Sequence, residues 1–231
     1  TIARILGKQK FYTIAVAYKK ESLFLEFSDS DKNTYHQPTF VDLGLIEGII
    51  GNSAKADEYF GKSYQLAEKI TDLSSREKAF AKTDLQFAHT LRLKGDCQKA
   101  LPFYDKAVNF YITSEFQPYL YNSHKGRLLC YLQEKREIEF YKEFSVISQL
   151  FQQYRNEIIE EQNRNSFFDG EQDLYDIAIR YEYDKGNTEN AFNFAEESRA
   201  RSLLDLITKG GKISGYQTTP EIKVVSSVYQ P

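Results

Sequence analysis

Apolar residues in this chain recur with the 3.6-residue period of amphipathic α-helices, and short glycine turns interrupt the pattern. Before Gly95, the residues Phe87, Ala88 and Leu91 lie on one face of a helix. After Gly95, a second stripe of the same period contains Ala100, Phe103, Tyr104, Ala107, Val108 and Tyr111. The pattern therefore predicts a unit made of a helix, a short glycine turn and a second helix.

The glycine turns recur at a nearly constant spacing. Gly7, Gly51 and Gly95 are 44 residues apart, and Gly186 follows 91 residues later, which is about two further periods. An alanine stands five residues after three of these turns, at Ala56, Ala100 and Ala191. In the unit between Gly95 and Gly186 the pattern is weaker, and we place its small-residue position near Ile138. This regularity indicates stacked units.

Nine helices are predicted, with turns and loops between them. They span residues 11–27, 39–50, 53–71, 75–94, 98–114, 118–132, 136–162, 171–185 and 188–208. We expect Asp29–Asn33 and Pro38 to lie in a connection and Asn163–Gly170 to form a loop. Ser74 and Glu77 have the spacing of a capping box that opens a helix.

The predicted fold is all-α, a right-handed superhelical solenoid of helix-turn-helix repeats, because no alternating β pattern occurs before residue 220. The repeat domain is predicted to cover residues 1–211. Residues 212–231 lose the helical pattern and are predicted to be a linker toward a C-terminal domain outside this sequence.

Composition narrows the possible functions. The chain has 231 residues, with 30 Lys and Arg against 33 Asp and Glu, for a net charge of −3. That balance argues against nucleic acid as the main partner, and no apolar run approaches the ~20 residues of a membrane span. Two cysteines and three histidines make a disulfide framework or a metal cluster unexpected. We therefore expect a cytoplasmic protein with no metal and no cofactor.

Two loose catalytic patterns have ordinary explanations. The segment Ala56-x-x-x-x-Gly61-Lys62-Ser63 satisfies a phosphate-loop pattern, but it lies inside a predicted helix with no strand before it. His124 and Cys130 are six residues apart on one predicted helix, so their side chains point in different directions. No set of nucleophile, base and oxyanion donors can be assembled, and we expect that the chain is not an enzyme.

Two segments resemble tetratricopeptide repeats. They are Gly51-Asn-Ser-Ala-Lys-Ala56, preceded by Leu43-Gly44, and Leu93-Lys-Gly-Asp-Cys-Gln-Lys-Ala-Leu-Pro-Phe-Tyr104. The period of 44 residues is similar to the extended repeats of kinesin-light-chain-type arrays. The resemblance covers about nine tenths of the chain. It implies a protein-binding scaffold in which the first helix of each unit lines a concave groove.

Residues 185–206 resemble the final repeat that precedes a CHAT domain, which is a caspase-like, separase-related cysteine protease. The stretch Ser198-Arg-Ala-Arg-Ser-Leu-Leu-Asp-Leu206 carries this match. It implies a protease domain that follows in cis, and it makes Arg199, Arg201 and Asp205 candidates for docking against that domain. A solvated helix face explains the same charges equally well.

The groove candidates are taken from the predicted first helices. One stripe before Gly95 contains Lys82, Leu85, His89 and Arg92, and further candidates are Arg127, Arg180 and Tyr183. A mixed, locally basic groove would bind an acidic or C-terminal peptide segment by charge-assisted hydrogen bonds, whereas ordinary solvated helix faces remain the simpler alternative.

The expected function is a non-catalytic protein-interaction scaffold, the sensor or recruiting regulatory region of a CHAT-domain protease. The alternative is a stand-alone receptor for a signalling peptide.

Overall fold

The computed structural model describes residues 11–25, 29–114, 117–154 and 161–210. Within these ranges the backbone is helical apart from turns and contains no strand, which confirms the all-α prediction. The side chains described are those of residues 11–25, 33–114, 118–153 and 171–200. The predicted linker at 212–231 and the first predicted turn at Gly7 lie outside the described residues.

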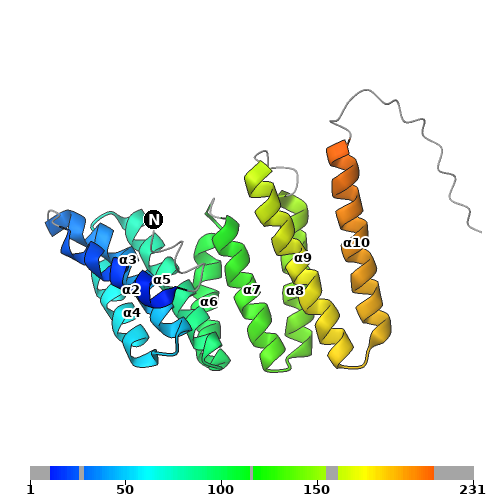
Figure 1. The fold of residues 1–231 in the computed structure, drawn as a ribbon, viewed down its shortest axis with the longest axis horizontal. Coiled ribbons are helices and arrows are strands. Elements are labelled where there is room, and N and C mark those ends of the chain that lie inside the picture. Colours follow the sequence, from blue (N-terminus) through cyan, green and yellow to red (C-terminus); the bar gives the residue numbers. More distant parts are fainter. Residues whose placement is uncertain (1–10, 26–28, 115–116, 155–160, 211–231) are drawn as a thin grey trace, which may run out of the picture. The chain divides into compact units, whose positions relative to one another are not determined.

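The helices follow one another with short connections (Figure 1). Their bounds are α2 Tyr12–Glu21, the 3₁₀ helix η1 Ser22–Phe24, α3 Asp29–Ile49, α4 Ser53–Glu68, α5 Leu73–Leu93, α6 Cys97–Tyr111, α7 Gln117–Gln133, α8 Glu137–Tyr154, α9 Glu161–Asp184 and α10 Thr188–Gly210. The chain divides into two compact units, Thr1–Leu174 and Tyr175–Pro231, with the boundary inside α9.

In the first unit, helices pack as stacked hairpins. Helix α3 packs on α4, α5 on α6, and α7 on α8. The first helices of successive hairpins also touch, since α3 contacts α5 and α5 contacts α7, while α4 and α6 each contact the hairpin that follows. In the second unit, Tyr175 of α9 lies against Phe194 of α10, with ring centroids 6.4 Å apart. In the first unit, each hairpin thus buries its apolar stripe against its neighbours.

The first helix of each hairpin ends in a left-handed turn. Gly51, Gly95 and Gly186 have φ values of 88°, 91° and 78°, and Lys135 has φ 56° in the equivalent place. At each turn the amide of the next residue donates to a carbonyl five residues earlier: Asn52 to Glu47, Asp96 to Leu91, Arg136 to Tyr131 and Asn187 to Glu182, at 2.8–2.9 Å. This is the Schellman arrangement, which satisfies carbonyls at a helix end.

Lys135 therefore forms the turn of the unit between Gly95 and Gly186, where the sequence pattern is weaker. The spacings between successive turns are 44, 40 and 51 residues. The residue five positions after Lys135 is Phe140, which is buried like Ala56, Ala100 and Ala191 at the same offset. The placement of this position at Ile138 was wrong, because Ile138 is 67% exposed. A lysine can adopt a positive φ at some cost in strain, so the turn lacks its usual glycine.

Three predicted boundaries were also wrong. Helix α3 begins at Asp29 and continues through Pro38, so this stretch is not a connection. Gln37, next to this proline, is buried, and its side-chain amide donates to Ser63 Oγ at 3.0 Å, to Thr83 Oγ1 at 2.9 Å and to the carbonyl of Ala79 at 3.2 Å. These bonds hold the turn that contains Pro38 against α4 and α5.

The other two boundaries concern α9 and α5. Residues 163–170, predicted to be a loop, lie inside α9, while the predicted helix 136–162 includes α8, and its residues 155–160 lie outside the described ranges. Helix α5 begins at Leu73 with Asp72 as its cap, since the Asp72 carboxylate accepts from the Ser75 amide at 2.8 Å. That bond satisfies an amide at the helix start, so Asp72 and not Ser74 is the cap. A hydrogen bond from the Ser75 side chain, together with this amide bond, lowers the pKa of Asp72.

Aromatic side chains on the second helices fill the space between hairpins. Phe60, Tyr104 and Phe144 each lie nine residues after a turn, and all three are buried. Glycines on the facing helices make room for two of these rings. A Cβ atom at Gly126 would lie 2.2 Å from the Tyr104 ring, and one at Gly44 would lie 3.0 Å from the Phe60 ring. Within the described residues, no helix is long and apolar enough to cross a bilayer.

The close approach at Gly126 predicts that Gly126→Ala destabilises the chain. The added methyl group must displace the fully buried Tyr104 ring, at a cost of about 1–3 kcal/mol. Denaturant unfolding followed by circular dichroism measures this loss. Gly61→Ala in α4 is the matched control, because nothing lies within 4 Å of its Cβ position and alanine favours the helix. Equal shifts in the two variants would contradict the packing described.

The left-handed turn at Lys135 predicts the opposite effect for a glycine substitution. Lys135→Gly should raise the free energy of unfolding by up to about 1 kcal/mol, because glycine adopts a positive φ without strain. Lys94→Gly provides the control, since Lys94 is also exposed but has the right-handed φ of −76°. The control variant should lose stability, and a loss in both variants would argue against the turn.

Candidate functional site

The predicted groove residues of α5 divide between surface and core. Lys82, His89 and Arg92 are partly exposed, whereas Leu85 is 3% exposed and belongs to the core cluster with Ala81 and Ala88. Leu85 is therefore not available to line a groove, because its apolar side chain packs between helices. The polar members of the stripe remain as surface candidates.

His89 and Arg92 interact directly on this surface. The Nη2 atom of Arg92 lies 3.3 Å from Nδ1 of His89. A guanidinium only donates hydrogen bonds, so we assign Nδ1 as the acceptor and place the imidazole proton on Nε2. Burial, helped by the charges of Arg92 and Lys125, lowers the pKa of His89 to about 4. At neutral pH His89 is thus an uncharged side chain with an N–H donor at Nε2.

Arg92 has a hydrogen-bond donor for which the described residues provide no acceptor. Its Nε atom is buried and has no hydrogen-bond partner among them, and no carboxylate in the described ranges forms an ion pair with it. A guanidinium offers five donors in a planar fork that matches a carboxylate. Arg92 is therefore a partly exposed cation of α5 without an acidic partner in the described ranges, although its unpartnered Nε atom is itself buried.

Lys125 of α7 adds a third donor that the sequence reasoning missed. Its ammonium binds the carboxylate of Asp173 on α9, and it lies 5.8 Å from the centroid of the Tyr121 ring. Lys125 stands ten residues before the Lys135 turn, as Leu85 stands ten before Gly95. That register alone does not identify Lys125 as a surface donor, because Leu85 in the same place is buried. His89, Arg92 and Lys125 are called the donor cluster below.

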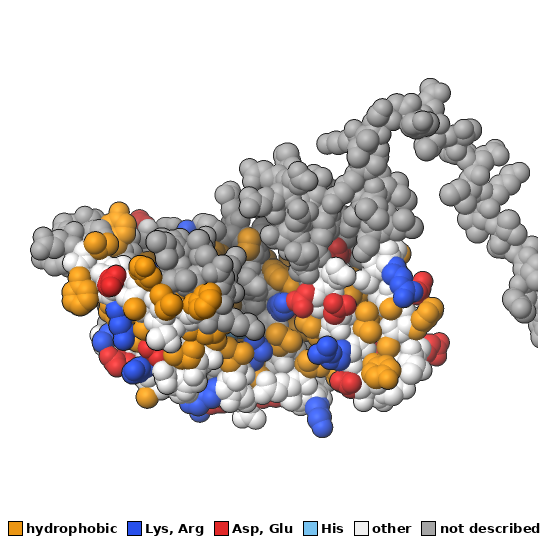
Figure 2. Space-filling view, in the orientation of Figure 1, with side chains coloured by type: hydrophobic (Ala, Val, Ile, Leu, Met, Phe, Trp, Pro, Cys, Tyr) orange, Lys and Arg blue, Asp and Glu red, His pale blue; other side chains and the backbone are white. Residues whose placement is uncertain are grey.

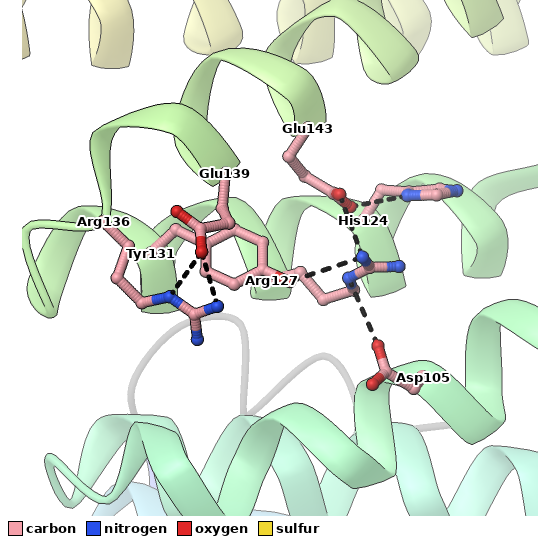
Figure 3. A network of polar contacts seen from close by, with 7 residues as sticks. All are labelled: Asp105, His124, Arg127, Tyr131, Arg136, Glu139 and Glu143. Carbon is pink, nitrogen blue, oxygen red and sulfur yellow. Dashed lines mark hydrogen bonds and ion pairs between the residues drawn. The ribbon is translucent and has the colours of Figure 1, made fainter.

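Arg127, another predicted groove cation, belongs to a polar network between helices (Figure 3). Its guanidinium lies 3.4 Å from Asp105 of α6 and 3.3 Å from Glu143 of α8. The other oxygen of Glu143 lies 2.6 Å from Nδ1 of His124. Two carboxylates thus hold Arg127, and the residue connects three successive helices rather than offering a free charge.

Tyr131 extends this network toward the turn. Its ring centroid lies 5.9 Å from the Arg127 guanidinium and 4.9 Å from that of Arg136, and Arg136 pairs with Glu139 at 2.7 Å (Figure 3). Cations over an aromatic face are attracted by its negative charge density. The cluster therefore ties α7 to the start of α8.

The rejected catalytic patterns lie in helices, as expected. Gly61 and Lys62 are inside α4, where Lys62 pairs with Glu58. Cys130 is buried, and burial together with a hydrogen bond between its thiol and Cys97 raises the pKa of the thiol, which disfavours a reactive thiolate. In the ranges with described side chains, no group of three His, Cys, Asp or Glu residues could hold a metal ion.

The remaining candidates lie in the second unit. Arg180 is exposed, and Tyr183 is 68% exposed near the end of α9. Arg199 is exposed on α10 and pairs with Glu196 in the preceding turn. The side chains of Arg201 and Asp205 lie outside the described residues, so their proposed docking role stays a prediction. On the face shown in Figure 2, basic and acidic side chains are interspersed rather than gathered by sign.

Comparisons with known proteins bear on the fold. No protein-family model matches this chain, and no curated protein matches it. The crystal structure of BtubC (BKLC) from P. vanneervenii is similar, with a TM-score of 0.52 over 94% of this chain and 97% of that one. The two sequences are 11% identical, so the similarity concerns the fold alone. It is compatible with a helical repeat.

The lowered pKa of His89 predicts that stability falls in mild acid. The folded state favours neutral His89, whose pKa is about 4 there and about 6.5 in the unfolded chain. The contribution of His89 to the free energy of unfolding is therefore fully present above pH 6.5 and is lost as the pH falls toward about 4. At pH 5 the loss due to His89 is about 2 kcal/mol relative to pH 7. Urea unfolding at both pH values should show a smaller difference for His89→Gln than for the original chain. An equal difference would show that His89 is not buried as a neutral group.

Proposed function

We propose that this chain is a non-catalytic interaction module that binds an acidic protein segment on the surface of its first helices. The observation that carries the proposal is the donor cluster, in which two helices of adjacent hairpins bring one arginine, one lysine and one neutral histidine together. All three side chains carry N–H groups, and none of the ion pairs in the described ranges involves Arg92. Such a set favours an anion over a cation or an apolar ligand.

The spacing of cations along α5 suits an extended peptide. Lys82 and Arg92 are ten residues apart on one helix, which corresponds to about 15 Å along its axis. An extended chain covers that distance with about four to five residues. The ligand would therefore be a short acidic stretch or an acidic C-terminus, with Arg92 binding one carboxylate in its fork and Lys82 contacting a second.

The biological setting we propose is the sensor or recruiting region of a CHAT-domain protease. The proposal rests on the similarity of residues 185–206 to the repeat that precedes such domains. In the structure this segment includes the turn at Gly186 and runs through α10, which continues to Gly210. We expect the reading frame to continue past Pro231 into a β-rich segment that contains a histidine and a later cysteine. A frame that stops there would favour the peptide-receptor alternative.

Charge reversal on α5 tests the binding surface. The double variant Lys82→Glu and Arg92→Glu should weaken binding of a fluorescein-labelled hexapeptide, Gly-Ser-Gly-Glu-Glu-Asp, by more than about tenfold, because charge-assisted hydrogen bonds become repulsions. Fluorescence anisotropy measures the affinity. The matched control is Lys55→Glu with Lys69→Glu, at the two ends of α4, since both lysines are exposed and the charge change is equal. Unchanged affinity in the α5 variant, with its helix content retained, would refute this surface.

A further inference from the structure

One carboxylate of the chain already occupies the donor cluster. Asp173 binds Lys125 across 48 residues of sequence, and both side chains keep contact with water, at 27% exposed for Lys125 and 49% for Asp173. No other carboxylate in the described ranges pairs with His89, Arg92 or Lys125. The pair therefore joins an acidic side chain of α9 to the surface that the proposed function assigns to an acidic ligand.

The Lys125–Asp173 pair is of a kind that exchanges readily. Water and salt screen both charges, and two side chains must be ordered to form the contact, so exposed ion pairs contribute little to stability. By contrast, the buried Glu143 lies between His124 and Arg127 at distances of 2.6 and 3.3 Å. Replacement of Asp173 by another carboxylate costs little, whereas replacement of Glu143 would leave buried charge without a partner.

A carboxylate from a ligand can collect more donors than Asp173 does. Asp173 is attached to α9, and its described ion pair is with Lys125 alone. A ligand carboxylate that lies between α5 and α7 can accept from Lys125 and from the guanidinium of Arg92, which is partly exposed and forms no ion pair in the described ranges. The Nε2–H of His89 supplies a further donor that stays uncharged at neutral pH. Because a ligand carboxylate can accept from more donors than Asp173 does, binding of the ligand is favoured over the contact with Asp173.

We infer that Asp173 occupies the position at Lys125 that a ligand carboxylate would take, and that an acidic ligand binds by displacing Asp173. This inference rests on the proposed function and adds its regulation. Asp173 lowers the affinity for every acidic ligand by the strength of its own pair, so a ligand that reaches only Lys125 gains little. A ligand that also engages Arg92 gains contacts that Asp173 does not make. Competition with Asp173 therefore favours acidic segments that contact both α5 and α7.

The test measures whether removal of the Asp173 carboxylate tightens the binding of an acidic peptide. The full 231-residue chain is titrated against the same labelled peptide, Gly-Ser-Gly-Glu-Glu-Asp, with Asp173→Asn and with the control Asp176→Asn. Asp176 is exposed on the same helix, so the control changes net charge equally without touching Lys125. Asp173→Asn should bind about threefold to fivefold more tightly than the original chain, the range expected from an exposed ion pair. Asp176→Asn should bind as the original chain does.

Lys125→Gln provides the second arm. It should weaken binding, and in its background Asp173→Asn should no longer tighten it, because the two substitutions then remove the same contact. Equal affinities of Asp173→Asn and Asp176→Asn, or a gain that persists without Lys125, would overturn the inference and leave the proposed function intact. Absence of binding in every variant, Asp173→Asn included, would refute both.

The source of the carboxylate is resolved by a peptide pair. A C-terminal amide of the same hexapeptide removes the terminal carboxylate and keeps the acidic side chains. If the amidated peptide binds more weakly, the terminal carboxylate is the group that binds the donor cluster. If both peptides bind equally, a side-chain carboxylate is that group. The tightening by Asp173→Asn is expected for the peptide form that binds, and its absence with both forms would overturn the inference.

Discussion

A left-handed residue ends the first helix of each hairpin, at Gly51, Gly95, Lys135 and Gly186, and the packing of the hairpins follows from this constraint. The turn directs the chain back along the helix that it ends. Its fixed geometry places a buried residue five positions later and, in three hairpins, a buried aromatic side chain nine positions later. The aromatic rings then fill the contacts between hairpins, and Gly126 is glycine because the Tyr104 ring leaves no room for a Cβ atom. One backbone conformation, repeated, thus accounts for both the local turn and the core.

Buried polar groups complete the packing and determine which charges stay at the surface. Gln37 connects α3 to α4 and α5, and Arg127 connects α6, α7 and α8 through Asp105 and Glu143. Such groups are stable in the interior only when each has partners, so they fix one relative position of the helices. By contrast, no carboxylate in the described ranges forms an ion pair with Arg92, and Lys125 pairs with Asp173 in a partly exposed contact. The proposed anion-binding surface is made of cations that the core does not pair internally.

The fold and the proposed function have different support. The all-α fold follows from the described helices, and the similarity to BtubC (BKLC) over 94% of the chain is compatible with a helical repeat. At 11% identity that similarity says nothing about ligands. The proposal of an acidic ligand rests instead on residue chemistry: a neutral histidine, an arginine without an acidic partner in the described ranges, and a lysine in an exposed ion pair. The CHAT assignment rests on sequence resemblance in residues 185–206.

The helical class, the glycine turns at Gly51, Gly95 and Gly186 and the alanines that follow them were predictable from the chain, because they depend on neighbours within a few residues. The turn at Lys135 was missed, since lysine carries no signal for a positive φ, and the place of Phe140 was missed with it. The inclusion of Pro38 in a helix, the burial of Leu85 and the pairing of Arg127 emerged from the packing of the helices. The contact of Lys125 with Asp173 was equally hidden, because it joins residues 48 positions apart. Local periodicity can be read along a chain, but partners across helices depend on how the hairpins stack.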